Sequence, residues 1–120
     1  MEEIKLKIII AGGRDFNNYD LLKYTCDYLL KDQLNVEIVS GAAKGADSLG
    51  EQYAKEKGYL IKQFPADWDA HGKSAGYKRN SDMADYANAL IAFWDGTSKG
   101  TQHMINLANS KKLIVRIQKY

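Results

Sequence analysis

ALIAFWDGTSKGTQHMI, residues 89–105, is the stretch that decides the fold of this chain. It predicts a buried strand over Ala89–Trp94, a loop over residues 95–101 with two glycines, and then the start of a helix. A strand followed by a glycine loop and a helix directs free backbone N–H groups and the positive end of a helix dipole at an anion, most commonly phosphate. The glycine spacing matches neither the Walker motif nor the dinucleotide fingerprint. The stretch therefore predicts an anion site, and whether it forms part of a larger ligand pocket depends on the loops beside it.

The rest of the chain repeats the alternation of strand and helix. Residues 4–11 end as a continuous apolar run, which is typical of a central parallel strand buried on both faces. Further strands are expected at 36–40, 59–64 and 113–117, helices at about 18–31, 47–57, 73–86 and 101–110, and a polar loop at 66–72. Connections of this length require right-handed crossovers and a parallel sheet. The sequence therefore predicts an α/β fold with a single domain over residues 1–120, a Rossmann-like three-layer sandwich of about five parallel strands alternating with four helices.

The composition is typical of a globular domain without a strongly charged surface. The chain has 120 residues, of which 45% are hydrophobic and 27% charged, and its net charge is +2. This charge is too small to indicate nucleic acid by itself, because proteins that bind it usually carry a concentrated basic face. No apolar run reaches the ~20 residues that span a membrane, and Glu2 and Glu3 stand where a secretion signal needs basic residues. Cys26 has no second cysteine to pair with and is expected in the core, so we expect a cytoplasmic protein with no membrane partner.

Three strand-to-helix loops consist largely of small and polar residues: 12–16, 41–47 and 95–101. In an open parallel sheet, these loops lie along one edge, and ligands bind there where the strand order reverses, usually beside the first strand. The loops at the opposite edge have the sequences of ordinary caps and turns. A tight turn explains one such loop easily and three less well, so the pattern favours a ligand site.

The helix expected at 73–86 adds a cationic group to this edge. Arg79 lies one turn before Met83 and is expected to run its stem over apolar surface and to present its guanidinium into the cleft. The alternative is a surface ion pair with Asp82 or Asp85, which contributes well under ~1 kcal/mol. Trp68, in the loop at 66–72, and Trp94, before the loop at 95–101, are the two candidates to stack on a base, with core packing as the alternative for Trp94.

Five motifs resemble the SLOG superfamily, and in particular its YspA-like branch. They are GGRDF at 12–16, SGAAKGAD at 40–47, PADW at 65–68, GKSAGYKRNSDM at 72–83 and FWDGTSKGTQHMI at 93–105. The LOG phosphoribohydrolases and the DprA Rossmann-like domain are more distant resemblances. The resemblance implies a Rossmann-like domain that binds a nucleotide or a nucleotide-derived ligand, as a sensor, carrier or sequestering module.

Carried over motif by motif, the resemblance implies a role for each loop. The first glycine loop would line the base or ribose, the second would form another wall, the arginine motif would face the ligand, and the loop at 96–101 would hold phosphate. Together with the analysis of the loops, the expected ligand-binding residues are Gly12, Gly13, Arg14, Gly41, Gly45, Asp47, Trp68, Arg79, Asn80, Asp95, Gly96, Thr97, Ser98, Gly100 and Thr101.

One departure from the LOG pattern bears on catalysis. LOG hydrolases carry PGGxGTxxE, and alignment of its GT with Gly100 and Thr101 puts Met104 where the catalytic glutamate belongs. Methionine has no proton to exchange, and loss of a general acid or base typically lowers the rate by about 10²–10⁴-fold. Ligand binding without catalysis is therefore expected. The alternative is an N-glycosidase or phosphoribohydrolase with Arg79 and Asp95 as candidate catalytic residues.

A second alternative is DprA-like binding of single-stranded DNA, which the interleaving of basic and acidic residues disfavours, so nucleic acid is not an expected partner. With only two histidines and one cysteine, no metal site is expected, although magnesium could accompany a bound phosphate through Asp95 or Asp47. His103, near the start of its helix, is expected to be neutral. The resemblance also implies possible homo-oligomers that associate through helices.

Overall fold

The computed structural model describes residues 6–120, which form a five-stranded parallel sheet in the order β3-β2-β1-β4-β5. Its strands are β1 (Leu6–Gly12), β2 (Val36–Ser40), β3 (Leu60–Gln63), β4 (Ala89–Trp94) and β5 (Ile114–Lys119). Four helices connect them: α1 (Tyr19–Leu30), α2 (Ala46–Lys57), α4 (Ala75–Tyr86) and α5 (Lys99–Ser110). The expected Rossmann-like α/β sandwich with five parallel strands is confirmed. None of the helices in residues 6–120 has the length and apolar character needed to cross a membrane.

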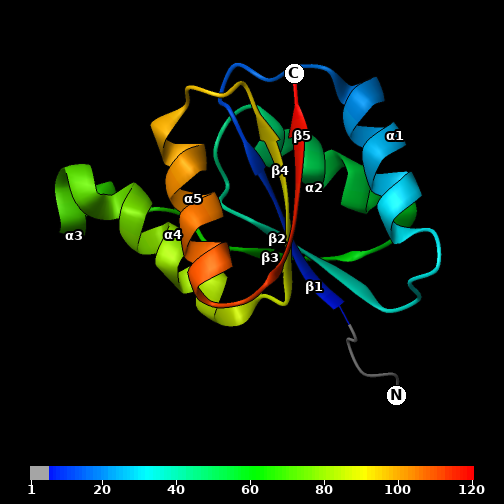
Figure 1. Cartoon of the computed structure of the whole chain (residues 1–120). Helices are drawn as coiled ribbons and strands as arrows, with labels where there is room; N and C mark the ends of the chain where they lie inside the picture. The colour runs from blue at the N-terminus through cyan, green and yellow to red at the C-terminus, as the bar shows by residue number, and fades with distance from the viewer. Residues whose placement is uncertain (1–5) are drawn as a thin grey trace.

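Two expectations about local structure need comment. The part of the first strand that was expected at residues 4 and 5 lies outside the described residues. The loop expected at 66–72 is wrong, because the chain there forms a short helix, α3 (Trp68–His71), and a 3-10 turn, η1 (Gly72–Ser74), before α4 begins. The Asp67 side chain caps α3 by accepting a hydrogen bond of 3.0 Å from the N–H of Ala70. In Figure 1, α3 projects away from the sheet at the start of α4.

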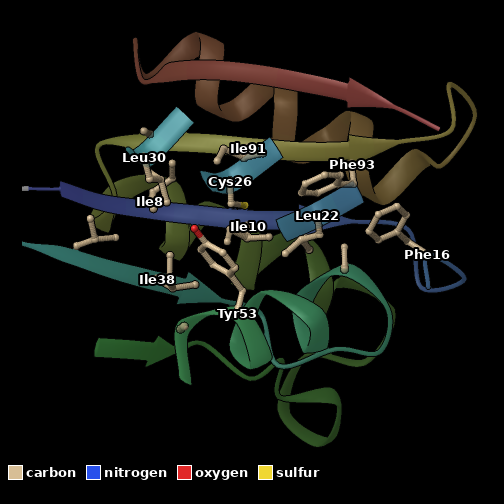
Figure 2. Packing of buried hydrophobic residues seen from close by; sticks show 14 residues of the cluster. Ile8, Ile10, Phe16, Leu22, Cys26, Leu30, Ile38, Tyr53, Ile91 and Phe93 are labelled. Carbon is tan, nitrogen blue, oxygen red and sulfur yellow. The ribbon is translucent and has the colours of Figure 1, made fainter. Parts of the chain in front are cut away.

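Alternate residues of the central strands face two separate core layers, so each face of the sheet is covered by its own pair of helices. On one face, Ile8 and Ile10 of β1 pack in one cluster with Leu22 and Cys26 of α1 and Tyr53 of α2 (Figure 2). Cys26 is fully buried, as expected. Figure 1 shows α4 and α5 on the opposite side of the sheet from α1 and α2. There the buried side chains are Ile9, Ala11, Val39, Met83, Ala84, Ala87, Leu90, Ala92, Met104, Ile105 and Ala108.

The strand order reverses beside β1. From β1 the chain first builds outward through β2 and β3, and then returns to place β4 and β5 on the other side. At this reversal the crossovers lead to opposite faces of the sheet, which leaves a crevice at the carboxyl ends of β1 and β4. Gly12 pairs with Phe93 there, and a Cβ on Gly12 would lie 2.3 Å from the Phe93 carbonyl oxygen. The close approach of the two strands at the crevice therefore requires glycine at position 12.

We expect Gly12→Ala to lower the free energy of unfolding by about 2–3 kcal/mol, because backbone atoms of β4 must move to admit the methyl group. The measurement is urea unfolding followed by circular dichroism. Gly100→Ala is the matched control: no atom lies within 4 Å of its added Cβ, and alanine in a helix should raise stability by up to about 1 kcal/mol. Equal stability of the two variants would contradict the proposed constraint.

Candidate functional site

A cavity of about 490 Å³ opens at the crevice between β1 and β4. It is bounded by the loops after β1, β2 and β4, by the start of α5, and by α3 and α4. The expected residues that line it are Gly12, Gly13, Arg14, Asp47, Trp68, Arg79, Asn80, Ser98, Gly100 and Thr101. Of the described residues that were expected at the site, Gly41, Gly45, Asp95, Gly96 and Thr97 are not part of the lining. The structure thus brings most of the expected residues together.

Asp95 shapes the loop after β4 instead of facing the cavity. Its Oδ1 accepts hydrogen bonds of 2.8 Å from the N–H groups of both Thr97 and Ser98. These two donors hold the pKa of the Asp95 carboxyl below its ordinary value. Asp95 therefore closes the turn that delivers the chain to α5, and of the two candidate catalytic residues only Arg79 lines the cavity.

Gly41 and Gly45 support the wall of the cavity from behind. Gly45 has a φ of 77°, and a Cβ there would lie 2.2 Å from the Gly13 carbonyl oxygen, so glycine lets the loop after β2 close on the loop after β1. The N–H of Ala46 donates to that same oxygen at 3.2 Å. The Gly41 carbonyl accepts a hydrogen bond from Nη1 of Arg79. Both glycines thus act on the site through the backbone.

Arg79 reaches the sheet edge as expected, and the alternative of a surface ion pair is wrong. Its Nη1 donates to Gly41, and its Nε donates to Oδ1 of Asn80 at 3.1 Å. The two candidate acids pair elsewhere: Asp82 lies 3.2 Å from Lys78, and Asp85 pairs with Lys111. Burial lowers the pKa of the Arg79 guanidinium, which nevertheless stays charged.

Asp47 places a buried carboxylate in the cavity. It lies in the first turn of α2, is 7% exposed, and accepts a hydrogen bond of 3.3 Å from the N–H of Ala43. Burial raises its pKa to about 6, although the positive charge of Arg79 acts in the opposite direction. A carboxyl that titrates near neutral pH in a cleft is a mark of functional sites.

The start of α5 presents backbone N–H groups without a partner in residues 6–120. Ser98 is the N-cap residue, but its side chain caps no backbone N–H, and its hydroxyl instead lies 3.1 Å from the hydroxyl of Thr101. Among the described residues, no partner is found for the N–H groups of Lys99, Gly100 and Thr101. Gly100 and Thr101 line the cavity, so their N–H groups and the helix dipole are available to an anion there.

The rim and floor combine expected residues with others that the sequence did not indicate. Trp68 is 51% exposed, with the guanidinium of Arg14 5.9 Å from its ring centroid. Asp15, Lys73 and Tyr77 also line the cavity. The apolar floor includes the buried Met104. Asp15 and Tyr77 lie inside the GGRDF and GYKRN motifs, so the motifs could have revealed both, whereas nothing distinguishes Lys73 from a solvated lysine.

Tyr120, directly after β5, also makes an unexpected contact. The hydroxyl of Tyr120 donates a hydrogen bond of 3.0 Å to Oδ1 of Asp15. Burial and this carboxylate raise the pKa of Tyr120 to about 12, so the hydroxyl keeps its proton. Sequence reasoning missed this contact because the residues are separated by 105 positions and Tyr120 belongs to no motif.

The cavity therefore offers backbone N–H groups and cations for an anion, carboxylates for hydroxyl or amino groups, and an aromatic rim for a planar ring. In residues 6–120, no group of three or more His, Cys, Asp or Glu side chains could hold a metal ion. Of the two carboxylates expected for magnesium, Asp47 lines the cavity and Asp95 does not.

We expect Asp47→Asn to stabilise the fold at alkaline pH. Because the folded-state pKa of about 6 exceeds the ordinary 3.8, the stability that Asp47 contributes is full below pH 3.8 and is lost as the pH rises past 6. Asparagine keeps an oxygen for Ala43 and stays neutral. The variant should exceed the wild type by about 2–3 kcal/mol at pH 8, and the difference should shrink toward pH 4.

Urea unfolding at both pH values measures this difference, and Asp20→Asn, at an exposed first-turn position of α1, is the control. If Asp47→Asn were less stable than the wild type at pH 8, attraction by Arg79 would outweigh burial.

Comparison with known proteins agrees with this fold. The sequence profile of the YspA, cpYpsA-related SLOG family matches residues 6–71. The gene 61 protein of Mycobacterium phage D29 is 31% identical to this chain over an alignment covering 85% of the chain and 87% of the phage protein.

Among solved structures, DNA processing protein A (DprA) from Streptococcus pneumoniae superimposes with a TM-score of 0.77 over 93% of this chain. At 17% sequence identity this likeness concerns the fold alone, and the chain spans 50% of the DprA chain. The family match extends over more than half of the sequence, from β1 through α3. The chain belongs to the YspA, cpYpsA-related SLOG family.

Proposed function

We propose that this domain binds a nucleotide or a nucleotide-derived ligand in the cavity between β1 and β4. The phosphate binds at the start of α5, where Gly100 and Thr101 offer N–H groups, and Arg79 adds a positive charge. The observation that carries the proposal is that these anion-binding groups share one cavity with the buried Asp47.

The other parts of the ligand follow from the remaining lining. Asp47 and Asp15 accept hydrogen bonds from hydroxyl or amino groups, such as those of a ribose. Trp68 at the rim stacks on the base, and its half-exposed position leaves one face open for that contact. A volume of about 490 Å³ is in the range of small-molecule sites.

The proposed role is binding without cleavage. The glutamate that LOG hydrolases use is replaced by Met104, which lies buried in the cavity floor. Asp95, the other candidate for acid–base chemistry, is engaged with the backbone of its own turn. A domain that holds a ligand and releases it unchanged is suited to sensing, carrying or sequestering that ligand.

One observation favours hydrolysis of an N-glycosidic bond as a second candidate function. The pKa of Asp47 is raised to about 6, which suits a group that donates or accepts a proton near neutral pH. In that case Asp47 would replace the missing glutamate and exchange the proton as water attacks C1′ and the base leaves, and Arg79 would hold the phosphate that stays on the ribose.

We expect calorimetric titration to detect binding to at least one of AMP, ADP-ribose, NAD or a cyclic nucleotide. Arg79→Ala should weaken that binding by about 10–100-fold, because a charge-assisted hydrogen bond contributes about 1.5–3 kcal/mol. Lys78→Ala is the matched control, since Lys78 pairs with the exposed Asp82 and does not line the cavity. No binding by the folded protein to any of these compounds would overturn the proposal.

We expect no free base after prolonged incubation of concentrated protein with AMP or NAD, as measured by chromatography. Base released by the wild type and absent with Asp47→Asn would establish the hydrolytic function instead. Fluorescence anisotropy with single-stranded DNA at two salt concentrations tests the remaining alternative, because a DNA-binding groove gives strong salt dependence.

A further inference from the structure

The side chain of Asn80 joins α4 to α5 beside the cavity. Its Nδ2 lies 3.3 Å from the Gly100 carbonyl oxygen and 3.2 Å from Nδ1 of His103, both on α5. Its Oδ1 accepts from Nε of Arg79 at 3.1 Å. Asn80 is 7% exposed, so these contacts are shielded from water. One buried amide thus connects the arginine of the cavity to the helix end proposed to bind phosphate.

The neighbours of this amide fix its orientation. Nε of Arg79 only donates hydrogen bonds, and the Gly100 carbonyl only accepts them. A flipped amide would set donor against donor and acceptor against acceptor, so Nδ2 must face α5. Because Nδ2 donates, Nδ1 of His103 must accept, and the imidazole is therefore neutral with its hydrogen on Nε2.

The surroundings of His103 also favour the neutral ring. From α4, the ring of Tyr77 packs edge-on at 4.5 Å between centroids, and Asn80 stands between His103 and the charge of Arg79. Burial lowers the pKa of His103, and no charged side chain is among the causes of this shift. The sequence predicted a neutral His103 because of the helix dipole. In the structure, burial is the cause of the lowered pKa.

We propose that neutral His103 is a positioning residue for the cavity: as the Nε2–H tautomer it holds Asn80 between Arg79 and the start of α5, and its protonation releases this connection. A proton on Nδ1 would face the N–H of Asn80, so the amide or the ring must turn away. If the amide turns, the Gly100 carbonyl and the Arg79 guanidinium lose their common partner; if the ring turns, Asn80 loses one of its two contacts with α5. The expectation that acid weakens ligand binding rests on the proposed function. The contact between α4 and α5 through Asn80 and His103 does not depend on it.

The first test needs no ligand. Long-range ¹H–¹⁵N spectra at pH 7.5 should show His103 as the Nε2–H tautomer, with His71→Gln used to assign the two histidines of the chain. On acidification, the side-chain amide of Asn80 and the backbone amide of Gly100 should shift with the titration of His103. In His103→Asn, whose amide oxygen can take the place of Nδ1, these shifts should disappear. An Nδ1–H tautomer, or Asn80 signals indifferent to His103, would overturn the proposal.

Asn80→Asp gives a second, opposite test. A carboxylate accepts from both Arg79 and a protonated Nδ1, so the titration midpoint of His103 should move upward by at least one pH unit. Gln102→Ala, a neighbour on α5 that hydrogen-bonds Asn106, should leave it unchanged. A midpoint unaffected by Asn80→Asp would contradict the contact.

Binding of ADP-ribose at pH 7.5 and 5.5 tests the consequence, because its diphosphate does not titrate in this range. On acidification, the affinity of the wild type should fall about fivefold more than that of His103→Asn. Any effect of protonating Asp47 is the same in both proteins and cancels in this comparison. Equal losses, or a gain by the wild type, would overturn the positioning role. Absence of ADP-ribose binding would count against the proposed function. The spectra would still test the contact between His103 and Asn80.

Discussion

The hydrogen bond from Arg79 to the Gly41 carbonyl is the contact on which the cavity depends. It ties α4, which covers one face of the sheet, to the end of β2, whose next helix covers the other face. The loop after β2 also contacts the loop after β1, through the hydrogen bond from Ala46 to Gly13. Arg79 therefore stabilises the positions of both loops. A charged side chain can serve this purpose at the carboxyl edge of the sheet because Arg79 lines the open cavity and is not enclosed in the core.

The sequence was sufficient for the fold because its signals are local and periodic. Continuous apolar runs at β1 and β4 and glycine loops at their carboxyl ends predict a parallel sheet with a crevice beside β1, which the structure contains. The error at 66–72 also has a local cause: a four-residue helix is too short to show a hydrophobic period, and its residues are all exposed.

The site was less predictable than the fold because loop residues can act in two ways. Within a motif such as SGAAKGAD, sequence does not separate Asp47, which lines the cavity, from Gly45, which lets two loops approach. Nor does it distinguish Arg14 at the rim from Asp95, whose oxygen closes its own turn. Contacts such as that of Tyr120 with Asp15 arise only from strand order and cannot be derived from motifs.

The electrostatic arrangement of the cavity argues for a site that holds its ligand. A buried carboxylate at position 47 raises the energy of the empty protein, since burial outweighs the attraction of Arg79. Buried carboxyls with raised pKa values of this kind cluster at functional sites. A ligand with hydroxyl or amino groups would satisfy the carboxylate, while its phosphate neutralises Arg79 and the start of α5. We propose that this charge pattern serves binding, because Met104 at the position aligned with the LOG glutamate adds no second carboxylate that could stabilise a developing cation.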